Sequence, residues 1–177
     1  MFSRKDKYFL FADNTTELNV DAIKIKDKFV LIYRNTGKNN NFDKLKKLRE
    51  DCKKKYIKFY VANDTRLYSR LRADGLYISA FNKDLRLKSF NSSKSKNIGS
   101  AHNLKEIRLK INQGCKTIIF SRLFVTNYDN KSGYLGVVKF NLLSKIYNTK
   151  LIPLGGIRFY NLNKLKLLKA EGLCILS

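Results

Sequence analysis

The sequence predicts an α/β protein in which short parallel strands alternate with helices around a barrel. Eight short apolar runs occur along the 177 residues, and longer segments with helical spacing separate most of them. This alternation is typical of a parallel sheet whose strands are connected by helices. With eight strands in one domain, residues 1–177, the expected fold is a shortened (β/α)8 TIM barrel, because such barrels usually need roughly 250 residues.

The predicted strands are spread over the whole chain. They are expected at residues 8–12, 29–33, 57–61, 75–79, 97–100, 117–120, 151–154 and 173–176. Residues 13–28 and 81–95 leave room only for short or reduced helices, and no helix follows the eighth strand. The outer face of that strand must therefore be covered by a loop or by the second subunit of a homodimer, or stay partly exposed.

Four of the intervening segments carry apolar residues at helical spacing. Their predicted buried faces are Phe42, Leu45 and Leu48; Leu104, Ile107 and Ile111; Val138, Leu142 and Ile146; and Leu162, Leu165 and Leu168. An asparagine stands just ahead of three of these faces, at Asn41, Asn103 and Asn161. Asparagine is a favoured N-cap, so we expect each of them to start a helix.

The charge balance is strongly basic, with 37 Lys and Arg against 14 Asp and Glu, a net charge of +23. Nucleic acid, an anionic membrane or a phosphorylated small molecule are the partners such a charge favours. Because the lysines are spread along nearly the whole chain, we interpret most of them as a solvated surface and do not expect nucleic acid as the main partner.

The chain carries no sign of membrane insertion or of a disulfide framework. No apolar run reaches the roughly 18 to 20 residues of a membrane span, and no signal peptide is apparent, so we expect a cytoplasmic protein without a membrane partner. Cys52, Cys115 and Cys174 are odd in number and lack metal-ligand spacing. They are expected to be reduced thiols in or near the core.

Short motifs occur at or next to the predicted strands in a specific order. They are Asn63-Asp64, Ala73-Asp74-Gly75-Leu76, Ile98-Gly99-Ser100-Ala101-His102, Phe124-Val125-Thr126 and Leu154-Gly155-Gly156-Ile157. In this order and spacing the chain resembles the thiamine-phosphate synthase (thiamine monophosphate synthase) and thiazole tautomerase family, as a shortened and divergent member. The similarity runs over essentially the whole chain.

The resemblance implies an enzyme of thiamine biosynthesis, a transferase that joins hydroxymethylpyrimidine diphosphate to thiazole phosphate and releases pyrophosphate with the help of Mg²⁺. Its partners would be phosphorylated small molecules. The reaction passes through a cation-like pyrimidine beside the leaving diphosphate. Basic side chains and a carboxylate-held metal suit the diphosphate, and the main-chain amides of a glycine turn suit the thiazole phosphate.

On the diphosphate side, Arg34 falls at the arginine of the family's Gln-x-Arg-x-Lys pattern, where it would act in catalysis and binding. The lysine position is Thr36, and Lys38 is expected to replace it. Asn63 and Asp64 match the pair that contacts the diphosphate and the metal. The second metal carboxylate position reads Asn82, and Asp84 is the expected replacement.

On the thiazole side, the resemblance assigns Ser100 to catalysis and Thr126, Gly155 and Gly156 to binding. The family's lysine after the sixth strand is replaced by Asp129, and Lys131 is expected to compensate. Ser177 stands where the second half of the phosphate cradle would begin.

Each of these residues also has a structural interpretation. Asp64 can cap a helix, Arg34 can pair with Asp13, and a single histidine is often only a hydrogen-bonded structural residue. Losing one charge-stabilising donor commonly lowers a rate by roughly 100- to 1000-fold, so activity is expected to be reduced or lost. Two alternatives remain: a thiazole tautomerase-like isomerase that uses His102 as a proton shuttle, and a non-catalytic protein that binds a phosphate ligand or nucleic acid.

Overall fold

The computed structural model describes residues 7–15, 20, 23, 27–34, 41–92, 96–126 and 133–175. Its eight strands confirm the eight predicted ones, with every boundary within one residue. They are β1 (Lys7–Ala12), β2 (Phe29–Tyr33), β3 (Lys58–Ala62), β4 (Gly75–Ile78), β5 (Ile98–Ala101), β6 (Thr117–Ser121), β7 (Lys150–Leu154) and β8 (Gly172–Ile175).

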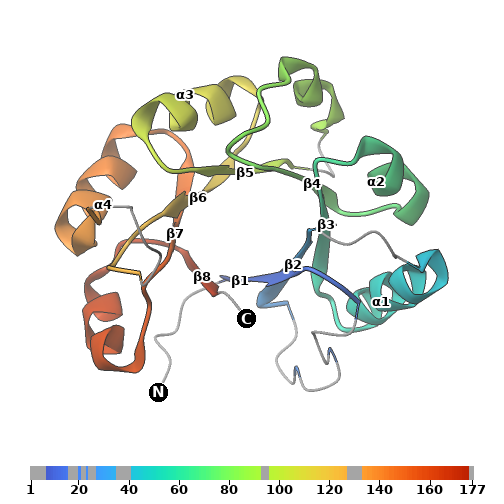
Figure 1. The fold of residues 1–177 in the computed structure, drawn as a ribbon, viewed down its shortest axis with the longest axis horizontal. Coiled ribbons are helices and arrows are strands. Elements are labelled where there is room, and N and C mark those ends of the chain that lie inside the picture. Colours follow the sequence, from blue (N-terminus) through green and yellow to red (C-terminus); the bar gives the residue numbers. More distant parts are fainter. Residues whose placement is uncertain are drawn as a thin grey trace.

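The strands form a nearly closed parallel barrel with the helices outside it (Figure 1). The hydrogen-bonded order is β7-β6-β5-β4-β3-β2-β1-β8. β7 and β8, at the two ends of this order, lie in contact. Gly172 of β8 faces the Ile152 side chain of β7, since a Cβ at this glycine would lie 3.3 Å from Ile152 Cδ1. The predicted barrel is confirmed.

Apolar side chains cover both faces of the barrel wall, because successive residues of a strand point to opposite sides. Phe9, Phe11 and Ile32 belong to the cluster inside the barrel. Leu31 and Tyr33, which come directly before and after Ile32, pack outside the barrel against the helices. Burial on both faces explains why the strands read as continuous apolar runs.

Four α-helices and two 3₁₀ helices of the described residues pack around the strands. They are α1 (Phe42–Lys54), α2 (Thr65–Leu71), η2 (Leu85–Phe90), α3 (Leu104–Asn112), α4 (Gly136–Ile146) and η3 (Phe159–Leu167). Asn41 and Asn103 accept hydrogen bonds from main-chain amides at the starts of α1 and α3, which confirms them as N-caps. The short η2 agrees with the reduced helix expected between the fourth and fifth strands.

The segment predicted to begin at Asn161 differs from the expectation. It forms the 3₁₀ helix η3, which begins two residues earlier at Phe159. Asn161 lies inside this helix, where its Oδ1 accepts a hydrogen bond from the main-chain N–H of Arg158 and its Nδ2 donates to the carbonyl of Gly156. The predicted N-cap is wrong, because the asparagine stabilises the turn before the helix from a position within it.

The predicted buried face of α4 is also wrong. Val138 and Ile146 are 73% and 72% exposed, whereas Phe140 is fully buried. Apolar residues surround this helix on several sides, so spacing alone could not identify the row that faces the sheet.

In α3, Ile107 is fully buried as predicted, but Leu104 and Ile111 are exposed. The second fully buried side chain of this helix is a lysine, Lys110. Lys110 is thus an exception to the interpretation of most lysines as a solvated surface.

The outer face of β8 is covered from within the chain. Leu173 is buried in the same cluster as Leu165, Leu168 and Ala170, which lie in or just after η3. The segment that precedes β8 therefore shields this side chain without a second subunit. All three cysteines are buried and free, as expected.

Candidate functional site

A cavity of about 890 Å³ lies at the carboxyl ends of the strands. It is lined by Phe11, Arg34, Ala62, Asn63, Asp64, Thr65, Arg66, Tyr77, Ser79, Ala80, Phe81, Ser100, His102, Ile119, Ser121 and Leu154. Five residues predicted for the site meet here: Arg34, Asn63, Asp64, Ser100 and His102. Parallel strands bring their carboxyl ends to one edge of a barrel, and this edge is where barrels of this class carry their active sites.

Arg34 lies at the end of β2, where Asp13 holds its guanidinium group. Arg34 Nε is 2.6 Å from Asp13 Oδ1, and Arg34 Nη2 is 2.8 Å from Asp13 Oδ2. The guanidinium carbon also lies 4.5 Å from the centroid of the Phe11 ring. The pairing with Asp13 is thus confirmed. It uses two of the five N–H donors of an arginine and fixes the plane of the group at the cavity wall.

Asn63 and Asp64 follow β3, and both line the cavity. Asp64 is the N-cap of α2, with its Oδ1 accepting a hydrogen bond of 2.8 Å from the N–H of Leu67. Asn63 has a left-handed backbone, φ 56°, and its Oδ1 accepts hydrogen bonds from Ser79 N and Asn82 Nδ2. The capping role of Asp64 is confirmed, and Asn63 joins the loops that follow β3 and β4.

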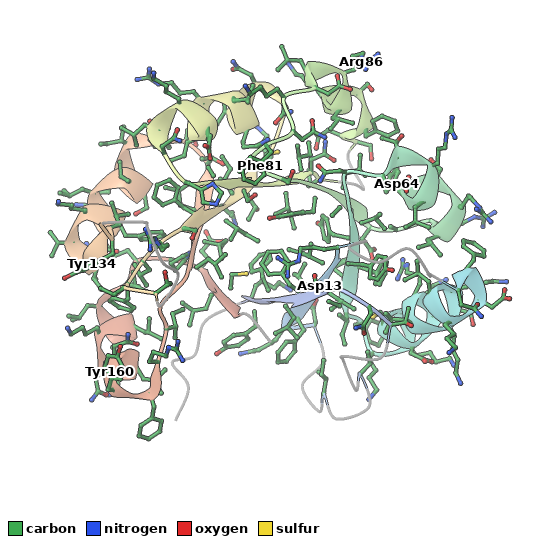
Figure 2. All side chains as sticks on the ribbon, in the orientation of Figure 1. Asp13, Asp64, Phe81, Arg86, Tyr134 and Tyr160 are labelled. Carbon is green, nitrogen blue, oxygen red and sulfur yellow. The ribbon has the colours of Figure 1, made fainter. Side chains whose placement is uncertain are left out.

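Asp84, the other predicted metal ligand, does not line the cavity. Its two carboxylate oxygens each lie 2.9 Å from a nitrogen of the Arg86 side chain. These hydrogen bonds lower the pKa of the Asp84 carboxyl below its usual value. Figure 2 shows Arg86 at the outer edge of the molecule and Asp64 nearer the barrel. The structure therefore does not bring the two candidate carboxylates together, and its described residues contain no cluster of three metal-ligating side chains.

Asn82 is held by a buried polar group beneath its loop. Lys110 Nζ donates to the main-chain oxygen of Asn82 at 2.7 Å and to Gln113 Oε1 at 2.8 Å. Gln113 Nε2 donates to the oxygens of Asn82 and Asp84. Burial lowers the pKa of Lys110 from 10.5 to about 8. At the position where the family resemblance implied a metal carboxylate, this chain has a structural asparagine anchored to α3.

Ser100 and Tyr77 form a polar pair in the cavity wall. The Tyr77 side chain is hydrogen-bonded to Ser100, and burial raises the pKa of Tyr77 to about 12. Its ring packs edge-on against Phe11, with centroids 5.5 Å apart. At neutral pH the pair consists of two uncharged hydroxyl groups that can donate and accept hydrogen bonds.

His102 follows β5 and is paired with Glu106. Glu106 Oε2 lies 3.1 Å from His102 Nδ1 and accepts a hydrogen bond of 2.7 Å from the main-chain N–H of the same residue. The imidazole also lies near Phe81, with ring centroids 6.1 Å apart. A carboxylate beside one imidazole nitrogen orients the ring and leaves the other nitrogen for a ligand.

Gly155 and Gly156 turn the chain after β7, where Leu154 reaches the cavity. Both have positive φ, 97° and 69°. A Cβ on Gly156 would clash with the main-chain oxygen of Val125, so only glycine allows this approach to the loop after β6. In that loop Thr126 Oγ1 accepts a hydrogen bond of 2.9 Å from Arg122 Nη1.

Several residues at or near the site were not predicted from the sequence. Arg66, in the first turn of α2, and Tyr77 line the cavity. Arg122 lies against Gly155, and Glu106 and Lys110 support the site from α3. Of these residues, only Glu106 could have been identified from the sequence. It stands three residues after the N-cap Asn103, the spacing of a capping box.

The remaining predicted residues Lys38, Lys131 and Ser177 lie outside the described part of the chain.

The fold and the cavity together define a (β/α)8-barrel protein with a cavity lined by polar and apolar side chains at the carboxyl ends of its strands. A family model described as thiamine monophosphate synthase matches residues 4–177. A thiamine-phosphate synthase from Pelagibacter ubique (strain HTCC1062) is 31% identical over 143 residues, which cover 78% of this chain and 69% of the relative. The chain belongs to the thiamine monophosphate synthase family, and this membership supports a role in thiamine biosynthesis.

Solved structures agree on the fold. A thiamine phosphate pyrophosphorylase from Pyrococcus furiosus superposes with a TM-score of 0.73 at 16% identity, covering 97% of this chain and 86% of that one. A truncated 3-deoxy-D-arabino-heptulosonate 7-phosphate synthase from Thermotoga maritima gives a TM-score of 0.65 at 16% identity, covering 97% and 74%. Within the described residues, no helix combines the length and apolar character of a membrane span.

Proposed function

We propose that this protein joins hydroxymethylpyrimidine diphosphate to thiazole phosphate and releases pyrophosphate. The observation that carries the proposal is the meeting of Arg34, Asn63, Asp64, Ser100 and His102 in one cavity at the carboxyl ends of the strands. These residues lie at the carboxyl ends of three strands, β2, β3 and β5. The family resemblance assigned Arg34, Asn63, Asp64 and Ser100 to this reaction from their positions in the sequence. Family membership supports the same assignment.

The diphosphate would bind between Arg34 and Arg66, the two arginines that line the cavity. Asp13 holds the Arg34 guanidinium in a fixed plane, so that its remaining N–H groups are oriented before the substrate arrives. Arg66 lies in the first turn of α2, two residues after Asp64, and adds a second positive charge to the cavity wall. It would take the place of the family lysine whose position is Thr36 here. Both guanidinium groups stabilise the negative charge that grows on the departing pyrophosphate.

The residues present fit a Mg²⁺ ion held mainly by the substrate. Mg²⁺ prefers oxygen ligands and is commonly bound by one or two carboxylates together with substrate phosphates. Asp64 is the carboxylate among the residues that line the cavity, and its cap uses Oδ1. Asp64 would hold the ion, which neutralises diphosphate charge when bound. Asn63 does not add a free oxygen, because its Oδ1 joins the two neighbouring loops.

The thiazole phosphate would bind at the turn formed by Gly155 and Gly156. Main-chain N–H groups at such a turn can approach a phosphate closely, and Thr126 lies in the adjoining loop. Arg122, which contacts both Thr126 and the turn, brings a cation to a loop that has lost the family lysine. The hydroxyl groups of Ser100 and Tyr77 would orient the thiazole ring in the cavity wall, so that its nitrogen faces the pyrimidine carbon that loses pyrophosphate.

The test is the formation of thiamine phosphate from both substrates in the presence of Mg²⁺. Arg34→Met should lower kcat/KM by roughly 100- to 1000-fold, because it removes a preoriented donor from the transition state. Arg108→Met, on the exposed side of α3, is the matched control and should leave the rate unchanged. No product from the unaltered protein, or equal rates for the two variants, would overturn the proposal.

The pairing of His102 with Glu106 favours one second candidate, a thiazole tautomerase-like isomerase. An oriented imidazole can move a proton between carbon and nitrogen near neutral pH, and this reaction needs no diphosphate site. His102→Gln should then abolish isomerisation of the thiazole phosphate while its affinity, measured by calorimetry, stays nearly the same. Isomerisation that survives this substitution would exclude the second candidate.

A further inference from the structure

We propose that Glu106 is a positioning residue that holds His102 in a single tautomer. In this tautomer the proton is on Nδ1, and the lone pair of Nε2 is presented to the cavity. The distance from His102 Nδ1 to Glu106 Oε2 is 3.1 Å, which is within hydrogen-bonding range. An ionised carboxylate can only accept hydrogen bonds, so the neutral imidazole must carry its proton on the nitrogen that faces Glu106.

The carboxylate is itself fixed from three directions. Its Oε2 also accepts the main-chain N–H of His102 at 2.7 Å, and its Oε1 accepts Asn103 Nδ2 at 2.7 Å. The N–H of Glu106 donates to Asn103 Oδ1 at 2.9 Å, which completes the cap of α3. Glu106 is only partly exposed, at 27% of its side chain. The carboxylate therefore cannot turn away from the imidazole without losing its hydrogen bonds from His102 N and Asn103 Nδ2.

This orientation has a chemical consequence for the ligand. His102 lines the cavity beside Phe81, whose side chain is 84% exposed. A hydrogen-bond acceptor next to an exposed aromatic ring fits a flat heteroaromatic group that carries an N–H or O–H donor, or a proton to be removed. The tautomer follows from the geometry alone, whereas its use on a heteroaromatic substrate rests on the proposed function.

The tautomer can be observed directly, because His102 is the only histidine in the chain. Nitrogen-15 spectra of the labelled protein, recorded at a pH where the imidazole is neutral, distinguish a protonated Nδ1 from a protonated Nε2. The unaltered protein should show the proton on Nδ1. Glu106→Ala should shift the population toward a proton on Nε2, the form that a free histidine side chain favours in water.

Asn103→Ala is the matched control. It disrupts the same helix cap from the other side and leaves the carboxylate opposite Nδ1, so the proton should stay on Nδ1. A proton on Nε2 in the unaltered protein would overturn the proposal, as would identical spectra before and after Glu106→Ala. An equal shift in both variants would mean that the helix cap, not the carboxylate, sets the tautomer. If Glu106→Ala does not fold, the spectrum of the unaltered protein still decides the first point.

Turnover provides a second readout that separates this inference from the proposed function. With either thiamine-phosphate formation or thiazole isomerisation as the assay, Glu106→Ala should lower kcat in the presence of His102 and have no further effect in a His102→Asn background. An equal loss in both backgrounds would contradict action through His102. If the unaltered protein catalyses neither reaction, the proposed functions fail while the tautomer result stands on its own.

Discussion

Lys110 is a fully buried cation without a carboxylate among its hydrogen-bond partners, and this arrangement predicts a specific dependence of stability on pH. Its ammonium group bonds to a main-chain oxygen of Asn82 and to the amide oxygen of Gln113. Burial lowers its pKa from 10.5 to about 8, against smaller opposing effects of Cys115 and Glu106. The folded protein should therefore release this proton at a lower pH than the unfolded chain.

The sign and size of the effect follow from this difference. Between pH 8 and 10.5 the unfolded chain binds more protons at Lys110 than the folded protein does, so the contribution of Lys110 to stability rises with pH. Below pH 8 the full cost of burying the charge is present, and above 10.5 it has disappeared. A pKa lowered by this much corresponds to about 3 kcal/mol in the free energy of unfolding.

The assay is urea unfolding of the unaltered protein and of Lys110→Met at several pH values from 7 to 10.5. Other groups also contribute in this range. Burial raises the pKa of Cys52, Tyr60 and Tyr77 to about 12, so these groups lose their protons in the unfolded chain first, which lowers stability at high pH. These effects occur in both proteins and cancel in the difference. The unaltered protein should gain about 3 kcal/mol relative to the variant as the pH rises.

Lys105→Met changes an exposed lysine of the same helix and is the control. Its stability should follow that of the unaltered protein at every pH. A difference between Lys110→Met and the unaltered protein that does not change with pH would refute the reasoning, because the lysine would then titrate alike in the folded and unfolded states.

Three further predictions concern the site and the charge. Asp13→Asn should raise the KM for the pyrimidine diphosphate by about 10- to 100-fold, because Arg34 loses its orienting partner; an unchanged KM would contradict this role. Gly156→Ala should destabilise by about 2 to 4 kcal/mol in urea unfolding, since strain and a clash with the main chain combine there. At Gly133 φ is also positive, but an added Cβ would have no other atom within 4 Å, so Gly133→Ala should destabilise by only about 1 kcal/mol. Equal losses of stability at the two glycines would show that the predicted clash at Gly156 is absent. The net charge of +23 should give nucleic-acid binding that is lost at physiological salt, whereas tight binding there with a steep salt dependence would favour the non-catalytic alternative.

The barrel was predictable because its strands are buried on both faces. Residues 29–33 are apolar at every position and residues 118–120 form the buried apolar centre of β6, which few other local structures require. The helices were harder to predict. In α4 the exposed row of Val138 and Ile146 is as apolar as the row that contains Phe140, so only packing against the sheet distinguishes them.

The position of the site was predictable because parallel strands bring all their carboxyl ends to one edge. Arg34 and Asp64 both line the cavity at this edge, and each also has the structural partner that was considered for it. Arg66 and Arg122 were not predicted, since a single basic residue in a chain with 37 of them carries no local signal. Asp84 was expected at the metal, but its carboxylate pairs with Arg86 two residues later, and Asp84 is not among the residues that line the cavity.

Sequence alone determined the order of the strands, the barrel and the loops that carry the site, because these depend on apolar periodicity and on motifs within short segments. Tertiary structure alone decided that Lys110 meets the Asn82 loop and that Arg122 meets the glycine turn, and it chose the pairing of Arg34 with Asp13 that the sequence had left as one of two interpretations. These contacts depend on distances between loops that are far apart in the chain. Such distances are set by the closure of the barrel and not by any local pattern.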